Sequence, residues 1–577
     1  MSEPNKKYIK LRVVLIAVVF SLLLTVIGLK AAYLQIYQGP WLSQLAAEQY
    51  EKSLKMSGKR GAIYDRNSTE MAVSLQVTSV AAYPGQVENS RQAARSLGRI
   101  LKLKPRALQK KLASKKSFVW LKRHATPLEV EEIKRLKIDG IEFISEYNRF
   151  YPNKTLAAQV IGFTGIDGNG LEGIEYYYDD YLKGTKGNVT LWRDALGHRF
   201  VAAGEKVADY SGNNIKLTID RTVHYIAERA LEDTVSEFYA KSVIAIVMVP
   251  RTGAILAIAH YPLFNPNDFL GFSSSDRRNR SITDPFEPGS TMKIFSAAAA
   301  IESGGSSPDA IFYCENGAYR IGKKVVHDMD DHGWLSLQQI IKYSSNIGAI
   351  KIGEMVGPER MYDSLSDFGF GSKTGIDCPG ETTGTLHPYK QWSRMDTSAI
   401  SFGHGLSVSP VQLITAVSAI ANGGVLMKPY IVAAITDQYK RSIYRFEPQK
   451  VRRVVSEQTA ATVSNIMQTV ITEGGTGTRA ALEGYTVCGK TGTAKKLSEE
   501  GTYTENTYVA SFVGYTPAQN AEIAILVIID EPQGKYYGGL VAAPAFGRIA
   551  RETLNYLDIP PGPDNQLAVS RQGGSNG

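Results

Sequence analysis

The feature that most constrains this chain is an uncharged, apolar segment near its N-terminus. Val13 to Leu29 contains no charged residue, and Arg12 and Lys30 bound it. A helix needs roughly 17–25 such residues to cross the hydrocarbon core of a bilayer, so residues 13–30 are predicted to form a transmembrane helix. Four basic residues precede this segment. This charge bias predicts that residues 1–12 form a cytoplasmic tail.

A cleaved signal peptide is the alternative interpretation of the same segment. Such a peptide has a shorter apolar core, followed by small residues at a cleavage site. Ala31-Ala32 is only a weak version of that site, and an amphipathic, helix-favouring stretch from Tyr33 to Lys55 follows without a break. We therefore predict an uncleaved anchor followed by a juxtamembrane helix over residues 31–59. No later segment is apolar for long enough to span, so the remaining bulk is expected outside the cytoplasm.

The length of 577 residues predicts two or three folded units. Residues 60–205 contain no nucleophile–base arrangement and are predicted to form a mixed α/β module, with helices over 89–137. Residues 213–558 have strand-like patterns at both ends and helical patterns between them. This order predicts one sheet, built from distant parts of the chain, with helices packed on it. Residues 559–577, which end in a polar, glycine-rich run, are predicted to form a disordered tail.

Charge and cysteine content exclude some functions. Ten lysines and arginines crowd residues 91–116. Such a run can contact nucleic acid, anionic lipid or an acidic polymer. Because no nucleic-acid motif accompanies it, we interpret it as a solvated helical face and predict no nucleic-acid partner. Cys314, Cys378 and Cys488 lack metal-like spacing and allow one disulfide at most, so we predict no metal site and no cofactor.

The first of three motifs that carry chemistry is Ser290–Lys293, which reads Ser-Thr-Met-Lys. Pro288 and Gly289 precede it and place Ser290 at the start of a helix, with Lys293 on the same face. A serine hydroxyl is a weak nucleophile until a base removes its proton, and a lysine does so only if its pKa is lowered. Ser290 is therefore the predicted nucleophile and Lys293 the general base. Alone, the motif is a weak signal, because both residue types are common.

The second motif is Ser344-Ser345-Asn346, between a helical stretch and an apolar run. Ser344 is predicted to relay a proton, and Asn346 to bind a substrate amide and to orient Lys293. A helix-capping cluster is the alternative reading of this motif by itself. Ser211-Gly212-Asn213 fits the same pattern, but it precedes the nucleophile and sits in a turn before a strand, so we reject it.

The third motif is Lys490-Thr491-Gly492-Thr493, after a strand-like segment. Lys490 is predicted to supply positive charge for a substrate carboxylate and to help keep Lys293 neutral. Thr491 and Thr493 are predicted to donate hydroxyls to that carboxylate, while Gly492 lets the substrate backbone lie against the strand. Lys373-Thr374-Gly375 is similar, but its glycine-rich surroundings predict a loop and a structural role.

The three motifs occur in this order, in helix, loop and strand contexts, within one predicted domain. This trio is typical of β-lactamases and penicillin-binding proteins. Together with Arg60–Asn67, Arg149–Pro152 and Gly170–Glu175, it makes the chain resemble a class B penicillin-binding protein, a monofunctional peptidoglycan D,D-transpeptidase. Asn265–Asn267, Gly403–Gly405 and Tyr537–Gly539 also resemble surroundings of that family's catalytic site.

The resemblance implies an α/β (α+β) fold. A serine β-lactamase/transpeptidase-like domain, an antiparallel sheet with helices on both sides, follows an elongated pedestal of the dimerisation type. It also implies that Ser290 attacks the D-Ala-D-Ala bond of a peptidoglycan stem peptide and that an amine of a neighbouring stem resolves the acyl-enzyme. The backbone N–H groups of Ser290 and Thr493 would form the oxyanion hole. β-Lactams would acylate Ser290 as substrate mimics.

Within class B the chain looks most like the septal, cell-division type, because of its single anchor, its compact pedestal and the amino-acid sequence of Ala158–Gly165. That implies an inner-membrane protein at the division septum, with the catalytic domain outside, and a SEDS-class glycosyltransferase and other division proteins as partners. The elongation type, a carboxypeptidase or β-lactamase, and a non-catalytic sensor or scaffold are the alternatives. Three departures from the family, His224, Val249 and His404, are given no catalytic task.

Overall fold

The computed structural model describes residues 3–42, 51–184, 186–193, 199–201, 211–497 and 503–562. It divides the chain into two compact units. The first consists of Met1–Gly58 and Thr185–Tyr210, and the second of Lys59–Gly184 and Ser211–Gly577. Each unit is described by itself.

The first unit begins with the long helix α1, Glu3–Ala32, which a short π-helical turn, Tyr33–Tyr37, continues. Tyr8–Tyr37 is, over the part of the chain that the structure describes, the one helix long and apolar enough to cross a membrane. Its valines, leucines and isoleucines are exposed on all sides. A helix that is apolar all round suits lipid rather than water, so the chain has the build of a single-pass membrane protein.

The rest of the first unit is a small antiparallel sheet. Strand β1, Glu51–Ser57, pairs with β6, Lys186–Arg193, which pairs in turn with β7, Arg199–Val201. The juxtamembrane helix predicted over residues 31–59 is therefore wrong at 51–57, and its residues 43–50 lie outside the described residues. The physical reason is that β1 obtains its hydrogen bonds from a strand far along the chain, a pairing that local helix propensity does not reveal.

The same pairing changes the predicted domain boundaries. Residues 185–205 are predicted to be part of the module over 60–205, but they group with β1 in the first unit, which includes Thr185–Tyr210. Residues 59–184 belong instead to the unit that holds the second predicted domain, residues 213–558. The link is a sheet, because the short strand β2, Ile63–Tyr64, pairs in parallel with β8, Asn214–Leu217.

That sheet has seven strands. Its order is β17-β16-β8-β2-β3-β4, and β5 also pairs with β3. The bounds of its remaining strands are β3 Glu70–Ala82, β4 Val119–Ala125, β5 Ile141–Phe150, β16 Val432–Thr436 and β17 Ser442–Arg445. Helices were predicted over 89–137, and the structure has three there, interrupted by β4: α3 Ser90–Leu101, α4 Pro105–Leu112 and α5 Pro127–Leu136. Leucines and alanines of α3 and α4, with Val130 and Ile133 of α5, pack with β3 and β4 in a core of their own.

A buried network of charges joins the pedestal segments. Glu175 is fully buried and accepts from two guanidinium groups, Arg60 Nε at 2.6 Å and Arg149 Nε at 2.6 Å. Arg60 also bonds Asp179 Oδ1 at 2.5 Å, and the Tyr151 hydroxyl donates to Glu175 Oε1 at 3.2 Å. Three segments distant in sequence are thus held together by paired charges, a geometry in which a buried ion pair can be stable.

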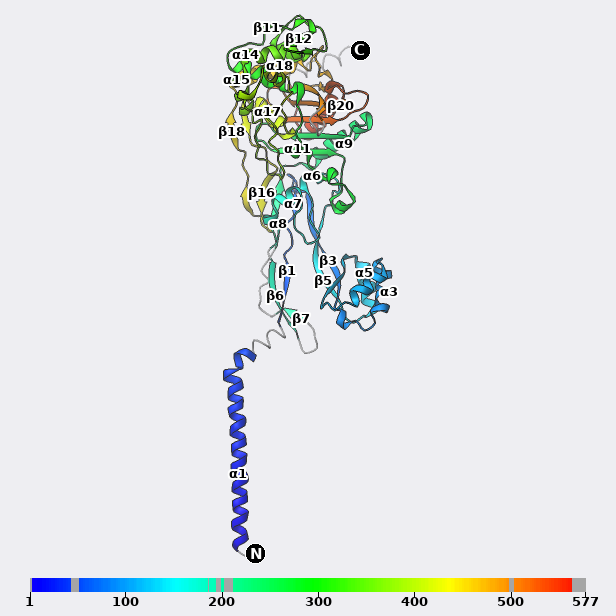
Figure 1. Ribbon diagram of the computed structural model, residues 1–577, viewed down its shortest axis with the longest axis vertical. Helices are drawn as coiled ribbons and strands as arrows, with labels where there is room; N and C mark the ends of the chain where they lie inside the picture. Colours follow the sequence, from blue (N-terminus) through cyan, green and yellow to red (C-terminus); the bar gives the residue numbers. More distant parts are fainter. Residues whose placement is uncertain are drawn as a thin grey trace, which may run out of the picture. The chain divides into compact units, whose positions relative to one another are not determined.

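The second predicted domain contains a five-stranded antiparallel sheet of order β10-β9-β21-β20-β19. As predicted, its strands come from both ends of the domain, and Figure 1 shows green strands beside orange ones there. Its strands are β9 Ser242–Met248, β10 Ile255–Tyr261, β19 Cys488–Leu497, β20 Tyr503–Thr516 and β21 Ile523–Asp530.

Helices cover both faces of this sheet. One face packs on α9, Arg221–Phe238, and α19, Gly538–Tyr556, through Val243, Ala245 and Val247. The alternate residues Ile244, Ile246 and Met248 belong to the core that holds α12, Lys293–Glu302, α14, Asn346–Val356, and α17, Pro410–Ala421. Because successive strand residues point to opposite faces, one continuous apolar run serves both layers.

The second unit contains further helices and strands. They are α6 Ala158–Ile161, α7 Gly173–Tyr177, α8 Asp179–Leu182, α10 Ser274–Arg277, α11 Arg280–Thr283, β11 Ile311–Tyr313, β12 Ala318–Ile321, β13 Lys324–His327, β14 Trp334–Ser336, α13 Leu337–Tyr343, α15 Pro358–Asp367, α16 Arg394–Ser401, β15 Val425–Met427, β18 Lys450–Arg453 and α18 Glu457–Thr469, with 3₁₀ turns η2 Pro84–Gln86, η3 Pro266–Gly271, η4 Gly289–Met292, η5 Glu315–Gly317, η6 Tyr389–Gln391 and η7 Thr478–Ala480.

Candidate active site

Ser290 lies in the 3₁₀ turn η4, directly before helix α12 begins at Lys293. Gly289 has φ of +55°, a left-handed conformation that favours glycine, and its N–H donates to Gly403 O at 3.1 Å. The Thr291 hydroxyl donates to Pro288 O at 2.7 Å. The turn is thereby held on both sides of Ser290, whose own side chain is half-buried.

Lys293 is fully buried one turn further on. Its Nζ donates to Ser344 O at 2.5 Å, to Ser344 Oγ at 3.3 Å and to Asn346 Oδ1 at 2.9 Å. Burial lowers the pKa of Lys293 to about 7, although the charge of Asp328 acts in the opposite direction. A lysine with this pKa is substantially neutral near physiological pH and can accept a proton.

Ser344 follows α13 and adopts the left-handed conformation, with φ of 62°. This kink directs both its carbonyl and its hydroxyl at Lys293. Asp328 fixes the next residues from the other side, because its carboxylate accepts from Ser345 Oγ, from Asn346 N and, at 3.0 Å, from Ile347 N. Asn346 Nδ2 also donates to His327 O at 3.0 Å, so its oxygen is oriented towards Lys293.

Lys490 reaches the same hydroxyl from strand β19. Its Nζ donates to Ser344 Oγ at 2.9 Å and to Thr491 O at 3.2 Å. Burial, and then the charge of Lys293, lower the pKa of Lys490 well below its usual value. Two buried amines around one hydroxyl disfavour two positive charges. The charge of Lys293 acts on Lys490 in this way, whereas the effect of Lys490 on Lys293 stays a prediction.

The remaining residues of the third motif bring β19 against the nucleophile turn. A Cβ added at Gly492 would lie 2.3 Å from Ser511 Oγ and 3.0 Å from Pro288 O, so no side chain fits there. Thr491 Oγ1 donates to Thr476 Oγ1 at 3.0 Å. Thr493 Oγ1 accepts from Gly538 N at 3.0 Å, at the start of α19.

The structure therefore gathers Lys293, Ser344, Asn346 and Lys490 into one hydrogen-bonded cluster and sets Thr491–Thr493 beside it. Ser290 is joined to this cluster through its own helix turn, and within the described residues no hydrogen bond links its hydroxyl to Lys293. Sequence reasoning missed Asp328, which holds the Ser344–Asn346 segment. One of several aspartates in a loop carries no local signal that distinguishes it.

Both rejected motifs lie elsewhere. Residues 211–213 form irregular structure before β8. Residues 373–375 lie in a loop, where the Thr374 hydroxyl and N–H donate to Glu381 Oε1 at 2.6 and 2.5 Å. Their role is structural, because the hydroxyl and backbone amide of Thr374 are both committed to closing that loop.

The three unusual residues also make structural contacts. His404 Nδ1 lies 2.9 Å from Glu287 Oε2, and Gly405 N donates to Glu287 Oε1 at 3.0 Å, which steadies the segment before Ser290. His224 Nε2 lies 2.9 Å from Ile258 O, where α9 packs on β10. Val249 N donates to Ala254 O at 2.9 Å and closes the β9–β10 hairpin.

Metal ligation finds no support in the described ranges, where no group of three or more His, Cys, Asp and Glu side chains could hold an ion. The three cysteines are free thiols, and all are buried. Burial raises the pKa of Cys488 to about 12, which leaves that thiol unreactive.

Comparison with known proteins identifies the class. Residues 243–551 match the model of the penicillin-binding protein transpeptidase domain, and residues 55–217 match the penicillin-binding protein dimerisation domain. The matched ranges lie close to the predicted domains at 213–558 and 60–205. The chain belongs to the penicillin-binding protein transpeptidase family and is a class B member, with a pedestal before its catalytic domain.

Named relatives cover almost the whole chain. Stage V sporulation protein D of Bacillus subtilis is 34% identical over 93% of this chain and 84% of its own length. Peptidoglycan D,D-transpeptidase FtsI of Escherichia coli is 31% identical over 100% of this chain and 97% of its own length. Among solved structures, penicillin-binding protein 3 of Mycobacterium tuberculosis in complex with aztreonam superposes with a TM-score of 0.68 at 28% identity, covering 88% of this chain and 98% of that one.

Proposed function

We propose that this chain is a serine-type peptidoglycan D,D-transpeptidase in which Ser290 is the nucleophile and Lys293 the general base. The observation that carries the proposal is the state of Lys293. It is fully buried, its pKa is lowered to about 7, and it is one helix turn from Ser290. Relatives across the full chain are named peptidoglycan D,D-transpeptidases, which supports the same reaction class.

Acylation begins when the neutral amine of Lys293 accepts the proton of the Ser290 hydroxyl. Ser290 Oγ then forms a bond to the carbonyl carbon of the penultimate D-Ala of a stem peptide. The backbone N–H groups of Ser290 and Thr493 stabilise the oxyanion, a type of contribution worth about 10²- to 10³-fold in rate. The C–N bond breaks, and the terminal D-Ala leaves as an amine.

Ser344 donates its proton to that leaving amine and takes up the proton that Lys293 accepted from Ser290, so that both Ser344 and Lys293 return to their starting forms. Its hydroxyl lies 3.3 Å from Lys293 Nζ and 2.9 Å from Lys490 Nζ, so it bridges the two amines. In deacylation the proton moves through Ser344 in the opposite direction, because the attacking amine of a second stem peptide must lose a proton. Asn346 orients Lys293 and binds the substrate amide.

The substrate carboxylate gives Lys490 its charge. Burial lowers the pKa of this lysine in the free protein, and an arriving carboxylate beside it has the opposite effect. Lys490 therefore becomes protonated as the D-Ala carboxylate binds. The hydroxyls of Thr493 and of Thr491, which turns from Thr476 Oγ1, donate to that carboxylate. The carboxylate of the correct substrate offsets the unfavourable proximity of the two lysines. The charge of the ligand therefore contributes to the specificity of binding.

β-Lactams acylate Ser290 because they present the same carbonyl and carboxylate as the substrate. A related structure, penicillin-binding protein 3, contains aztreonam. The apolar N-terminal helix and the basic residues before it support the proposal that the protein lies in the bacterial cytoplasmic membrane with its N-terminus in the cytoplasm. We propose that the protein acts at the division septum, with a SEDS-class glycosyltransferase and other division proteins as partners. Supporting this is the full-length similarity to FtsI.

The test of the reaction uses the purified full-length protein in detergent, a stem peptide that ends in D-Ala-D-Ala and a small amine acceptor. Mass spectrometry is expected to show the acceptor adduct with loss of one D-Ala. Hydrolysis product alone would contradict the transferase and favour the carboxypeptidase alternative. Ser290→Ala is expected to lose both products.

The test of location uses a fluorescent fusion of the full-length chain in growing cells. Midcell enrichment is the expected result. Patches along the lateral wall would contradict the septal assignment and favour the elongation role, without affecting the chemistry.

A further inference from the structure

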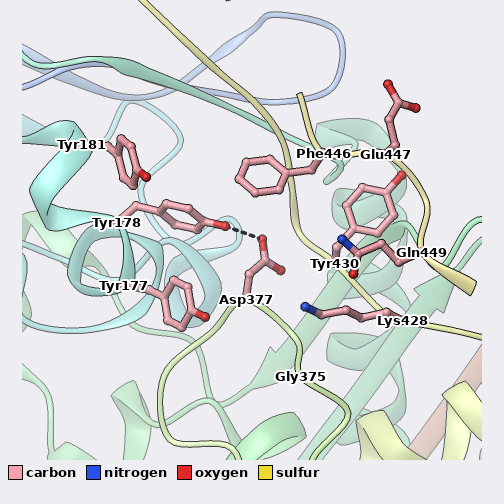
Figure 2. Close-up of a pocket in the computed structure, with 10 residues that line it drawn as sticks. All are labelled: Tyr177, Tyr178, Tyr181, Gly375, Asp377, Lys428, Tyr430, Phe446, Glu447 and Gln449. Carbon is pink, nitrogen blue, oxygen red and sulfur yellow. Dashed lines mark hydrogen bonds between the residues drawn. The ribbon is translucent and has the colours of Figure 1, made fainter. Parts of the chain in front are cut away.

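A second concave site lies apart from Ser290, in the same compact unit. It is a cavity of about 260 Å³, and none of its lining residues belongs to the three catalytic motifs (Figure 2). Its walls come from α7 and α8 on one side and from the segments that flank β16 and β17 on the other. The cavity is therefore built where the pedestal meets the catalytic domain.

Aromatic rings dominate its walls. Tyr177, Tyr181 and Phe446 are large side chains that remain 49%, 38% and 36% exposed. The rings of Tyr178 and Phe446 lie edge to face, with centroids 6.3 Å apart. Exposed aromatic faces that converge on a cavity mark a binding site more often than a random surface feature.

The floor of the cavity is rigid. The Tyr178 hydroxyl donates to Asp377 Oδ2 at 3.0 Å, the bond drawn in Figure 2. Asp377 also accepts from Ile431 N at 2.6 Å and from Val432 N at 2.8 Å. The carboxylate is thus occupied in holding Tyr178, between α7 and α8, to the start of β16, and it sets the shape of the site rather than contacting a ligand.

The rim carries polar side chains with no partner of their own. Lys428, Glu447 and Gln449 line the cavity. Within the described residues, no hydrogen bond or ion pair involves the side-chain amine of Lys428, the carboxylate of Glu447 or the side-chain amide of Gln449. They provide a donor, an acceptor and a group that can do both. Polar groups of this kind around apolar walls are what orients a ligand in a pocket.

The charges of the site select among ligand classes. A cationic ligand would suit the aromatic rings, but Lys428 opposes it. A phosphate-rich ligand is disfavoured because its negative charges would meet the carboxylates of Asp377 and Glu447 and only one lysine. A neutral ligand remains, with flat apolar faces for the rings and with hydroxyl and amide groups for the rim.

We propose that this cavity binds an N-acetylated amino-sugar unit of a glycan strand. Because the ring of Tyr178 lies between those of Tyr177 and Tyr181 (Figure 2), the flat C–H face of one pyranose ring would lie against Tyr177 and that of a neighbouring unit against Tyr181. Its hydroxyl and acetamido groups would bond Lys428, Glu447 and Gln449. The choice of an amino-sugar rests on the proposed function, since peptidoglycan is a polymer whose stem peptides hang from such strands.

A glycan held here would raise the effective concentration of its stem peptides at Ser290. Binding one part of a polymer turns the second contact into an intramolecular event. Even weak, millimolar affinity at the cavity would then matter for cross-linking a long strand, while a free stem peptide would gain nothing.

The test measures binding of a β-1,4-linked N-acetylglucosamine tetrasaccharide, without peptide, to the full-length protein in detergent. Tyr177→Ala and Tyr181→Ala, made separately, are each expected to raise Kd at least about tenfold, as loss of one aromatic stacking face predicts. Tyr225→Ala is the control, because Tyr225 is 56% exposed on α9 and outside the cavity. A tetrasaccharide of glucose, which lacks acetamido groups, is expected to bind more weakly.

Unchanged Kd in both cavity variants, or no binding by the wild-type chain, would overturn the proposal. Equal affinity for the glucose tetrasaccharide would overturn its acetamido component. Labelling by a fluorescent penicillin is measured in parallel and is expected to be the same in the wild type and in all three variants. Because that probe reports on Ser290 alone, failure of the proposed function would appear as lost labelling, independently of sugar binding.

Discussion

Two buried clusters of charged side chains in this molecule obey opposite rules. In the pedestal, Arg60 and Arg149 bracket the fully buried Glu175, so every charge faces an opposite one. In the catalytic domain, Lys293 and Lys490 are both fully buried around one serine hydroxyl, so two side-chain amines lie close together. The first arrangement stabilises the charges of its side chains, whereas the second disfavours the protonated form of its lysines.

The difference explains which cluster does chemistry. Ion pairing keeps the pedestal groups charged and inert, and breaking it would leave a buried charge without a partner. Burial lowers the pKa of both lysines, and at Lys293 it outweighs the opposite effect of the Asp328 charge, so a permanent cation becomes a base. Perturbed groups of that kind concentrate at functional sites, and they are maintained at a cost to stability.

The largest expected effect comes from removing the base. Lys293→Ala should lower the rate constant of acylation by a β-lactam by about 10²- to 10⁴-fold, the range expected for a lost general base. Thermal stability should be kept or raised, since a costly buried amine is gone. Stopped-flow acylation and a melting curve measure the two quantities. Lys390→Ala, an exposed lysine in the same domain, is the control that should change neither.

The pedestal cluster should respond in the opposite way. Glu175→Gln leaves two buried guanidinium groups without their carboxylate and should cost about 3–5 kcal/mol of unfolding free energy. Acylation of the protein that remains folded should be unchanged. Denaturant unfolding with a parallel penicillin assay tests this. Glu131→Gln, whose exposed pair with Arg135 is 4.0 Å long, should cost far less. Equal losses in the two variants would contradict the comparison.

The pH dependence of acylation distinguishes the clusters next. Lys293 acts in its neutral form, and burial lowers its pKa to about 7. The rate constant should therefore be maximal above pH 7 and fall about tenfold per unit well below it, because each unit reduces the neutral fraction tenfold. A rate that is flat from pH 5 to 8, or that rises only near the usual lysine pKa, would refute this role.

A smaller change is expected at Asp328. Its charge raises the pKa of Lys293, so Asp328→Asn should move the midpoint of the pH profile to lower pH. The same substitution weakens the cap on Ser345 and Asn346, and we expect a loss of about tenfold or less in maximal rate, comparable to one weakened hydrogen bond. A midpoint displaced to higher pH would show that Asp328 acts by another route.

The smallest effect is predicted for the rejected motif. Lys373 belongs to a Lys-Thr-Gly sequence identical to the start of Lys490–Thr493, but it lies exposed in a loop. Lys373→Ala should leave acylation unchanged, while Lys490→Ala should slow it strongly. A comparable loss in the two variants would mean that the two motifs had been assigned wrongly.

The catalytic motifs were predictable because each is local. Ser290 to Lys293 needs only a helix turn to place both side chains, and Lys490 to Thr493 needs only a strand. The five-stranded sheet could also be predicted in part, since β9, β10 and β21 are largely apolar runs. What the sequence did not reveal depends on long-range contacts. Strand β1 takes its hydrogen bonds from β6, and Asp328 acquires its role from a segment that folding brings to it.

The pairing of the buried charges in the pedestal could not be predicted from the sequence either. Arg60, Arg149 and Glu175 fall in three segments that the family resemblance marked, but nothing local shows that they meet. The lowered pKa values of the two lysines likewise follow from complete burial, which a sequence pattern suggests only by analogy.

The measurement that tests the central claim most directly is identification of the acylated residue. Full-length protein is incubated with penicillin, digested and mapped by mass spectrometry, with Ser290→Ala alongside. The account predicts one adduct, on the peptide that contains Ser290, and none on the variant. An adduct on another residue, or equal labelling of Ser290→Ala, would contradict it.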